Sequence, residues 1–373
     1  MKRIVPVDSD TKLKKFIDFP HDLYKDDPSY VPEIFIAQRD LLSPKKHPFH
    51  KHSSLQTFLA YDGDKIVGRI AAILNNNHNA FNKTNDGFFG FFDCINDQEV
   101  VNMLVEAATN WLKGKGITNI IGPVNFSTNE TCGLLIDGFT TPPYVMMTYN
   151  GPYYQQLLEN AGFGKKVDLL AYELTADDYD DRSVKLLDAL TQRLARKNII
   201  VRPISMKNYQ AEVNKVREVY NSAWDKNLGF VPMTKEEFDY LAKDLKMLLD
   251  PGLCLVAEHE GKTVGFGLAV PDVNQILIKV RRGRLLPTGI FKLLFGKKKI
   301  TRMRIIALGV IEEYRKMGIE GCFYGSLINR AFEKNIDHAE ASWILEDNMP
   351  MRLGIEGIKG KVYKTYRIFE KAI

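Results

Sequence analysis

The chain has 373 residues, of which 45% are hydrophobic and 26% charged, with 27 Gly and 16 Pro. This length predicts two domains, and the composition excludes a largely disordered or collagen-like chain. The four cysteines lie far apart without a Cys-x-x-Cys pair, which argues against a disulfide scaffold and a structural zinc site. We therefore expect a cytoplasmic protein. Without a long apolar run or an apolar leader, we expect it to be neither exported nor integral to a membrane.

The net charge of +5 is unevenly distributed. Residues 1–175 carry 17 Lys or Arg against 20 Asp or Glu, whereas residues 176–373 carry 34 against 26. The excess is concentrated in 279–304, which holds ten basic residues and no acid. Such a segment needs an anionic partner or a structural reason.

Strands and helices alternate through both halves of the chain. The first half predicts a strand, two helices, a hairpin, a strand and a helix at 4–7, 11–24, 32–42, 58–71, 88–93 and 100–113. After an acidic turn at 177–181, the second half predicts a helix, a strand, two helices, a hairpin, a strand and a helix at 183–197, 199–204, 209–224, 234–249, 254–269, 305–310 and 321–334. Thr234 and Glu237 have the spacing of a capping box.

Two anchors repeat between the halves. Gly68 and Gly265 occupy the same place in two similar hairpins, 197 residues apart. Asn150-Gly-Pro and Asn348-Met-Pro repeat with an offset of 198. Since both offsets nearly agree, we predict a duplicated domain, with copies at 1–175 and 199–373 joined by an acidic linker and helix at 176–198.

The segment 305–321 carries the clearest chemical signal. An apolar strand runs into an Arg-x-x-Gly turn that opens a helix, so free backbone N–H groups gather at a positive helix end. Such a turn binds phosphate or diphosphate. The alternative is an ordinary glycine-rich entry into a helix.

This turn resembles the acyl-coenzyme A loop of the GCN5-related N-acetyltransferase (GNAT) superfamily, whose pattern is Gln/Arg-x-x-Gly-x-Gly/Ala. Arg315 and Gly318 match, while Glu320 takes the place of the last small residue and Gly321 follows one position later. The resemblance implies an α/β (α+β) fold of two tandem GNAT-like domains, each a mixed twisted sheet flanked by helices. In that fold the fourth and fifth strands part to admit the pantetheine arm.

By the same resemblance, the co-substrate is acetyl-CoA or another acyl-CoA, held in the second copy. The implied contacts are the backbone of Leu308, Gly309 and Val310, the turn residues Arg315, Lys316, Gly318, Ile319 and Gly321, and Asn348. Asn348 could equally be a plain helix cap. The first copy lacks the loop, and its Asp97 and Glu99 would repel a phosphate.

Acyl transfer to an amine requires a base and a proton donor. Glu346 and Asp347 lie near the expected strand opening, with Glu258 and His259 on a facing strand, and Tyr363 could protonate the leaving thiolate. The alternative for each is a structural role. The family's usual tyrosine is absent, because Glu356 stands four residues before Gly360.

Two polar segments of the first copy remain. Asn125, Asn129 and Glu130 could contact the acceptor substrate, although a polar loop is the default. The histidines of 47–52 have a spacing that favours a surface loop, so we expect no metal.

Together the resemblance implies an N-acyltransferase, with acetyl as the first acyl group to expect. A small-molecule or peptide amine would attack the thioester directly in a pocket between the domains. The alternatives are an inactive ligand- or partner-binding protein and a membrane-associated transferase of long acyl or aminoacyl groups. The basic segment 279–304 could contact an anionic membrane, an acidic carrier protein or the cofactor phosphates, or be a surface helix that fills the core between the copies. A nucleic-acid partner is not expected, because aromatic residues are not interleaved with the charges.

Overall fold

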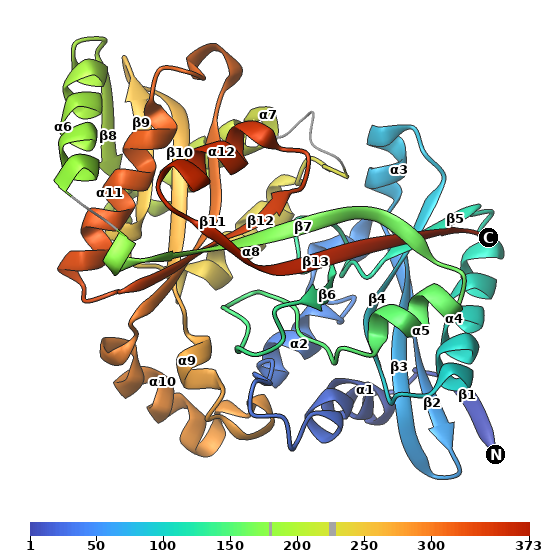
Figure 1. Ribbon diagram of the computed structural model, residues 1–373. Helices are drawn as coiled ribbons and strands as arrows, with labels where there is room; N and C mark the ends of the chain where they lie inside the picture. Colours follow the sequence, from blue (N-terminus) through green and yellow to red (C-terminus); the bar gives the residue numbers. More distant parts are fainter. Residues whose placement is uncertain (179–180, 224–228) are drawn as a thin grey trace. The chain divides into compact units, whose positions relative to one another are not determined.

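Figure 1 shows the computed structural model, which describes residues 1–178, 181–223 and 229–373. Contacts divide the chain into two compact units. Unit 1 comprises Met1–Leu169, Asn274–Lys297 and Lys364–Ile373, and unit 2 comprises Leu170–Val273 and Lys298–Tyr363. Two segments from the second half of the chain, 274–297 and 364–373, therefore pack with the first half.

Unit 1 is a mixed sheet with helices on it. Its elements are β1 (Lys2–Pro6), α1 (Asp10–Leu23), α2 (Phe35–Leu41), β2 (Ser54–Asp62), β3 (Lys65–Leu74), α3 (Asn76–Asn82), β4 (Asp86–Cys94), α4 (Gln98–Lys113), β5 (Asn119–Gly122), β6 (Leu134–Asp137), α5 (Tyr154–Asn160), α9 (Asn274–Leu277) and α10 (Ile290–Gly296). The strands β1, β2, β3 and β4 pair antiparallel in sequence order, and β4 pairs parallel with β5. The last residues of β13 (Lys361–Ala372) pair antiparallel with β5.

Alternation along β3 directs its side chains to two faces. Gly68 lies under α4, where a Cβ atom would stand 2.7 Å from a Leu104 methyl group, so the glycine permits close packing of the helix. Arg69 points to the other face, where its guanidinium carbon lies 5.0 Å from the ring centroid of Phe16 in α1. The apolar stripe of α4 forms the core of unit 1 with β2, β3 and β4.

Unit 2 repeats this plan. Its elements are α6 (Asp181–Ala195), β8 (Ile199–Pro203), α7 (Tyr209–Ala223), α8 (Lys235–Lys246), β9 (Cys254–His259), β10 (Lys262–Pro271), β11 (Arg302–Val310), α11 (Ile319–Glu333), β12 (His338–Leu345) and α12 (Met349–Gly357). The strands β8, β9, β10 and β11 pair antiparallel in order, and β11 pairs parallel with β12. The strand β7 (Gly164–Thr175) and β13 each begin in one unit and end in the other.

Helices cover both faces of the unit 2 sheet. Leu255 and Ala257 pack with α6 and α11, which lie side by side in Figure 1, while Val256 packs with α7 on the opposite face. Gly265 repeats the role of Gly68, since its missing Cβ leaves room for the Phe323 ring of α11 at 3.3 Å. The matching glycines are therefore explained by one packing requirement, met twice.

The predicted element types are confirmed wherever the structure describes them, with ends that differ by a few residues. The capping box is present, because Thr234 and Glu237 each accept the other's backbone N–H. Residues 179–180 of the predicted acidic turn, and Trp224 at the end of one predicted helix, fall outside the described residues.

Candidate functional site

The parallel strands β11 and β12 are paired along only the first half of β11. They pair from Arg302 opposite His338 to Ile305 opposite Ala341, and no pair follows in the described chain. On its other side β11 stays paired with β10 as far as Val310. One edge of 306–310 is therefore left without a strand partner, which is the opening that the resemblance implies.

A β-bulge coincides with the point of parting. Leu268 of β10 faces Ala307 while Ala269 faces Ile305, so Ile306 is the extra residue. A bulge bends its strand and increases its twist, which turns β11 away from β12. Ser342 follows the last paired residue of β12, and its carbonyl accepts a hydrogen bond from the Arg304 side chain at 3.2 Å.

Directly below the opening lies a buried polar cluster. Arg304 and Glu340 are opposite each other in the strand pair, are 2% and 0% exposed, and approach within 3.5 Å between Nε and Oε1. Ser342 accepts from Arg304 Nε at 2.9 Å and donates to Glu340. The hydroxyl of Tyr363 donates to the second carboxylate oxygen of Glu340. The charge of Glu340 is thus met by the Arg304 cation and by hydroxyl donors, as a buried carboxylate requires.

The turn after β11 leaves the first turn of α11 without a cap. Gly318 stands at the N-cap in the left-handed region, with φ of 98°, and provides no side-chain acceptor. The first helical bond runs from Cys322 N–H to the Gly318 carbonyl, so in the described chain the N–H groups of Ile319, Glu320 and Gly321 have no protein acceptor. Gly321 is exposed. Glu320 is half-buried and Ile319 is 0% exposed. Uncapped amides at a positive helix end can bind a diphosphate, and the Gly321 amide belongs to the most exposed of the three residues.

The two basic residues of the turn have different surroundings. The Arg315 guanidinium turns back onto the chain, donating to the Val310 carbonyl at 3.1 Å and to the Ala223 carbonyl at 2.9 Å. It therefore fixes the turn, and the Val310 carbonyl is already used. Lys316 is exposed and has a φ of 65°, so it remains accessible to an anion.

The glycines of the turn also serve helix packing. A Cβ at Gly318 would stand 2.7 Å from a Leu190 methyl group, and one at Gly321 would stand 3.1 Å from the other. One turn further along, a Cβ at Gly325 would stand 2.9 Å from a Leu187 methyl group of the same helix α6. A bulky residue at 318 or 321 would therefore disturb the α6–α11 contact whether or not a ligand binds there.

Asn348 caps α12, which is one of the two roles that the sequence allows for it. Its side-chain oxygen accepts from Met351 N–H at 3.3 Å, and in the described chain its amide nitrogen has no protein acceptor. Glu346 is half-buried and Asp347 is exposed. The Glu346 carbonyl accepts from Arg352 at 2.7 Å, which joins the end of β12 to α12.

A tyrosine that the sequence does not indicate lies beside α12. Tyr172 of β7 donates to Glu356 at 2.8 Å and accepts from Arg352 Nε at 3.2 Å. Burial raises the pKa of Tyr172, so the hydroxyl keeps its proton at neutral pH. Glu356 occupies the position where the family has its own tyrosine, and it binds a tyrosine from another strand. The alternation of side chains along β7 predicts that Tyr172 is buried, but no local sequence pattern connects Tyr172 to Glu356.

The other acid–base candidates of unit 2 are held in place by neighbours. Arg202 donates to both carboxylate oxygens of Glu258, at 2.8 and 2.7 Å, and this hydrogen bonding keeps the pKa of Glu258 below its usual range. Lys215 binds the same carboxylate at 3.2 Å. The Nδ1 atom of His259 lies 2.7 Å from the Tyr314 hydroxyl. The structure therefore gives each of them a structural contact.

In unit 1 the equivalent opening is filled by the chain itself. The parallel pair of β4 and β5 runs from Asp86 to Phe88, and the chain then continues along β4. Val124 N–H donates to the Phe89 carbonyl at 2.8 Å, and the Asn125 side-chain oxygen accepts from Phe91 N–H at 2.8 Å. The Asn125 amide also donates to Thr131 at 2.6 Å. Asn125 thus holds the loop against β4.

The helix after β4 is capped, unlike α11. Asp97 accepts from Glu99 N–H at 2.9 Å and from Val100 N–H at 3.3 Å, and Lys2 forms ion pairs with Asp97 and Glu99. Asn150, the repeat partner of Asn348, binds the backbone of Leu135 in β6. It accepts from Leu135 N–H at 2.8 Å and donates to the Leu135 carbonyl at 3.0 Å.

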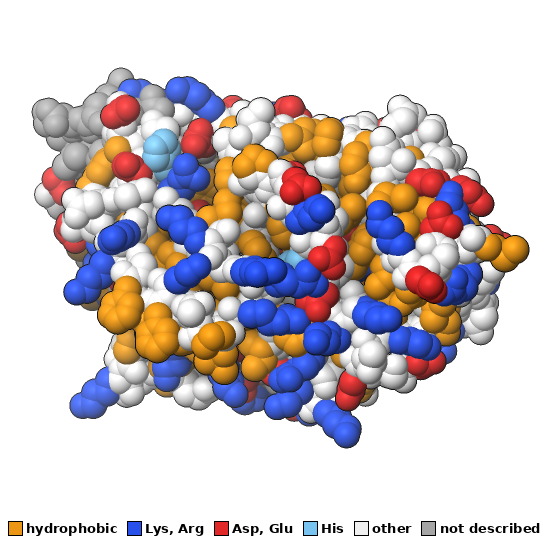
Figure 2. Space-filling model, turned by 90° about the horizontal axis from the view of Figure 1, so that it is seen from below, with side chains coloured by type: hydrophobic (Ala, Val, Ile, Leu, Met, Phe, Trp, Pro, Cys, Tyr) orange, Lys and Arg blue, Asp and Glu red, His pale blue; other side chains and the backbone are white. Residues whose placement is uncertain are grey.

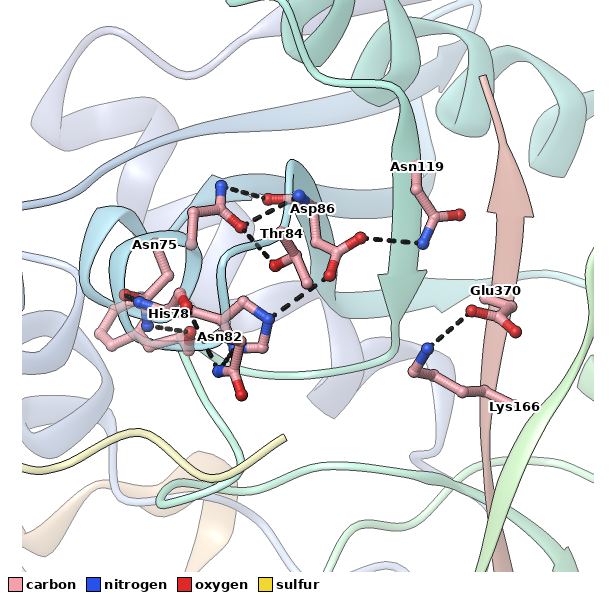
Figure 3. Close-up of polar contacts among 10 residues, drawn as sticks. Asn75, His78, Asn82, Thr84, Asp86, Asn119, Lys166 and Glu370 are labelled. Carbon is pink, nitrogen blue, oxygen red and sulfur yellow. Dashed lines mark hydrogen bonds and ion pairs between the residues drawn. The ribbon is translucent and has the colours of Figure 1, made fainter. Parts of the chain in front are cut away.

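The start of the β4–β5 pair holds a second polar network (Figure 3). His78 Nε2 lies 3.5 Å from Asp86, and Asn119 donates to the same carboxylate at 3.0 Å. The hydrogen bond with His78 lowers the pKa of Asp86 to about 2. The Lys166–Glu370 ion pair joins β7 to β13 nearby at 2.7 Å. These contacts link neighbouring elements of unit 1 to one another.

The remaining predicted residues of unit 1 lie in the loop after β5. Asn129 N–H donates to Ser127 at 3.1 Å, and Glu130 lies 3.8 Å from His47 Nε2. His47 is only 4% exposed, so the prediction of a plain surface loop is wrong for this residue. Among the described residues, no three His, Cys, Asp or Glu side chains are grouped to hold a metal. None of the described helices is both long and apolar enough to cross a bilayer.

Comparison with solved structures shows the fold. The chain resembles a tandem GNAT protein from the clavulanic acid biosynthesis pathway, with a TM-score of 0.59 and 12% identity over 100% of this chain and 98% of that one. It also resembles a GCN5-related N-acetyltransferase from Sphaerobacter thermophilus, with a TM-score of 0.53 and 12% identity over 99% and 95% of the two chains. The fold is therefore that of a tandem GNAT protein, as predicted.

Sequence comparison identifies the family. The chain is 35% identical to the bacterial ceramide synthase of Caulobacter vibrioides over 99% of its own length and 97% of that protein. It is 36% identical to protein YghO of Escherichia coli over 97% and 93% of the two chains. No family model matches. The chain belongs to the family of these two proteins.

Proposed function

We propose that this protein is an acyl-CoA-dependent N-acyltransferase whose co-substrate binds to unit 2. The observation that carries the proposal is the unpaired edge of 306–310 running into the uncapped start of α11. A pantetheine arm carries amide groups that can pair with a free strand edge, and a diphosphate fits free helix amides. The edge and the amides adjoin each other in the chain, as one extended ligand requires.

The residues of unit 2 then divide the work of holding acyl-CoA. The N–H groups of 319–321 receive the diphosphate, and Lys316 adds a positive charge beside them. Asn348 donates its free amide to the arm. Asn150 supports this role, because in unit 1 the repeated asparagine binds the backbone N–H and carbonyl of Leu135 through its side-chain oxygen and nitrogen. Acyl-CoA supplies the activated thioester carbonyl.

The chemical step joins the amine nitrogen to the acyl carbon and breaks the carbon–sulfur bond. The ammonium must lose a proton before attack, and the leaving thiolate must gain one. We assign the first task to the Glu340–Tyr363 pair, which adjoins the strand opening. We assign the second to Tyr172, which retains its proton and lies beside α12. Glu346 and Asp347, which follow the C-terminal end of β12, remain alternative bases.

The acceptor is proposed to be the amino group of a long-chain lipid base. The support is the relative named bacterial ceramide synthase, which covers nearly the whole chain. A ceramide is the amide of a fatty acid and a long-chain amino alcohol, so this chemistry is also N-acylation. It favours a long-chain acyl-CoA over acetyl-CoA.

Release of free thiol from acyl-CoA tests the proposal. The purified protein is offered short- and long-chain acyl-CoA with a panel of amines that includes long-chain amino alcohols, and amide products are identified by mass spectrometry. We expect thiol release that requires an amine. Tyr172→Phe and Glu340→Gln should each lower kcat by about a hundredfold and leave the affinity for CoA unchanged. Tyr209→Phe is the matched control, because its hydroxyl binds the Ala242 carbonyl of α8 and neither of the proposed acid–base groups.

The rival function is a ligand-binding protein without chemistry. Glu320 in the turn and the absence of the family's own tyrosine favour it. Such a protein would bind acyl-CoA and release no thiol with any amine of the panel. That result would contradict the proposed transferase and leave the binding site intact.

A further inference from the structure

The strongest unassigned feature is the exposed face of α10 in unit 1. Although α10 is a short apolar helix, none of its residues is buried. Phe291, Leu294 and Phe295 are 57%, 60% and 75% exposed, and Leu286 just before the helix is 79% exposed. The sequence alternative in which the leucines of this segment fill a core is therefore wrong for Leu286 and Leu294.

The exposed residues form one stripe. Positions 291, 294 and 295 have the spacing of a single helix face, and Figure 2 shows large hydrophobic side chains gathered at the lower left, where α10 lies in Figure 1. Apolar residues scattered singly on a surface need no explanation, whereas several large ones together mark an interaction site.

The segment around the stripe is firmly attached to unit 1. Arg284 donates to Asp18 of α1 at 2.9 Å and stacks on Phe35, with its guanidinium carbon 3.4 Å from the ring centroid. Arg282 forms an ion pair with Asp22 at 2.5 Å. A Cβ at Gly296 would stand 2.8 Å from Ile276 of α9, so the end of α10 is closely packed. The exposure of the stripe is thus a feature of an anchored helix.

The basic residues of the segment serve two purposes. Arg282 and Arg284 face acids of α1 and are neutralised there. Arg281 and Lys292 are exposed and have no acidic partner in the described chain. Lys292 lies in α10 itself and donates to the Lys279 carbonyl. No acid occurs between Asp272 and Glu312. The apolar stripe is therefore surrounded by positive charge, as Lys and Arg side chains around it show in Figure 2.

We infer that this face, the α10 face, docks on the surface of a bilayer that contains anionic phospholipids. Phenylalanine and leucine insert at the level of the headgroups, while the basic rim binds their phosphates. An acidic carrier protein would satisfy the charges but offers less apolar area to four large exposed side chains. The inference concerns unit 1 and does not depend on acyl transfer in unit 2.

Vesicle sedimentation of the full chain tests the α10 face. Vesicles of phosphatidylcholine alone are compared with vesicles containing about a third phosphatidylglycerol, at low salt. We expect at least about tenfold tighter binding to the anionic vesicles, lost at about 0.5 M salt. F291Q with F295Q should weaken binding about tenfold or more, and R281E with K292E by a similar factor.

Two control variants make the same changes in net charge and in polarity at positions outside the α10 face. Lys65→Glu with Lys113→Glu reverses two exposed charges of unit 1, and Ile200→Gln with Met247→Gln removes two exposed apolar side chains of unit 2. Both should bind as the native chain does. Circular dichroism checks that every variant is folded.

A fluorescence measurement does not depend on truncating the face. In Phe295→Trp the new indole should shift to shorter wavelength and be quenched by brominated phospholipid when anionic vesicles are added. The inference is overturned if the native chain does not bind anionic vesicles, including the case in which it binds an acidic carrier protein instead. It is also overturned if F291Q with F295Q binds undiminished, or if the indole at 295 stays unquenched.

Discussion

Unit 1 and unit 2 follow the same plan up to the parallel strand pair, and there they differ. In unit 1 the chain continues along β4, and Val124 and Asn125 occupy its hydrogen-bonding edge. In unit 2 the pairing of β11 with β12 stops at Ile305, and no described strand pairs with this edge beyond it. The helix that follows is capped by Asp97 in unit 1 and left uncapped at Gly318 in unit 2.

The difference teaches how a duplicated fold specialises. Backbone N–H and C=O groups need hydrogen-bond partners. A protein can supply these partners from its own chain, or it can leave the groups unpaired so that a ligand binds to them. Unit 1 supplies them from its own loop and from the Asp97 carboxylate, so it gains a closed, stable edge. Unit 2 keeps the edge and the helix amides unpaired, which fits binding of acyl-CoA. Substitutions in both units test this comparison.

The largest effect is expected at the buried ion pairs of the two sheets. Arg304→Ala leaves the Glu340 charge without its cation, and Arg69→Ala does the same to Asp93, which it contacts at 2.7 Å. Each should lower the free energy of unfolding by about 3–5 kcal/mol, measured by urea titration. Arg3→Ala, which removes an exposed ion pair with Asp64, should cost under about 1 kcal/mol. Equal losses of unfolding free energy for the buried and the exposed ion pairs would contradict the stabilising role given to the buried pairs.

Asp86→Asn should have the next largest effect. The pKa of Asp86 is about 2 in the folded chain against 3.8 for a free side chain, so the ionised form stabilises the fold by about 2 kcal/mol at neutral pH. The contribution is present above pH 3.8 and is lost as the pH falls towards about 2. Urea titrations should therefore show a gap between native and variant chains that closes in acid. A gap that is independent of pH would exclude the ionisation as its cause.

Lys316→Glu probes the open turn without disturbing the contact with Leu190. Reversal of an exposed charge beside the diphosphate should weaken acyl-CoA binding about tenfold, or about 1.4 kcal/mol, by calorimetry. Lys243→Glu makes the same change in net charge on α8 and should leave the affinity unaltered. Equal affinities for the two variants would remove Lys316 from the site.

Asp97→Ala is expected to have the smallest effect. Loss of the cap of α4 should cost about 1 kcal/mol of stability, read from the urea midpoint. Acyl-CoA binding should be unchanged, because unit 1 has no open edge beside this helix. Gain of a second binding site in calorimetry would show that the cap alone closes unit 1, and the filled edge of β4 would then not be the reason for the difference.

The sequence predicts much of the fold because its signals are local. The hairpins around Gly68 and Gly265, the helices with apolar stripes and the capping box at Thr234 all depend on residues close in the chain. The sequence does not show that 274–297 and 364–373 pack with unit 1, since periodicity does not specify which sheet a segment joins.

The candidate site is predicted less completely. The turn at 315–321 and Asn348 can be predicted because the strand–turn–helix pattern is continuous. Glu340 and Ser342 are two residues apart in β12 and therefore lie on the same face of the strand. The sequence thus contains a signal for this polar pair. Tyr172 is 184 residues from Glu356, so only the three-dimensional structure joins them. Leu190 likewise gives Gly318 a packing role that no spacing reveals.

A crystal structure with a non-hydrolysable acyl-CoA analogue tests the central claim most directly. We predict the diphosphate within hydrogen-bonding distance of the N–H groups of Ile319, Glu320 and Gly321, and the pantetheine arm along 306–310 between β11 and β12. An analogue bound along β4 in unit 1, or a β11 edge left empty at saturating analogue, would contradict it.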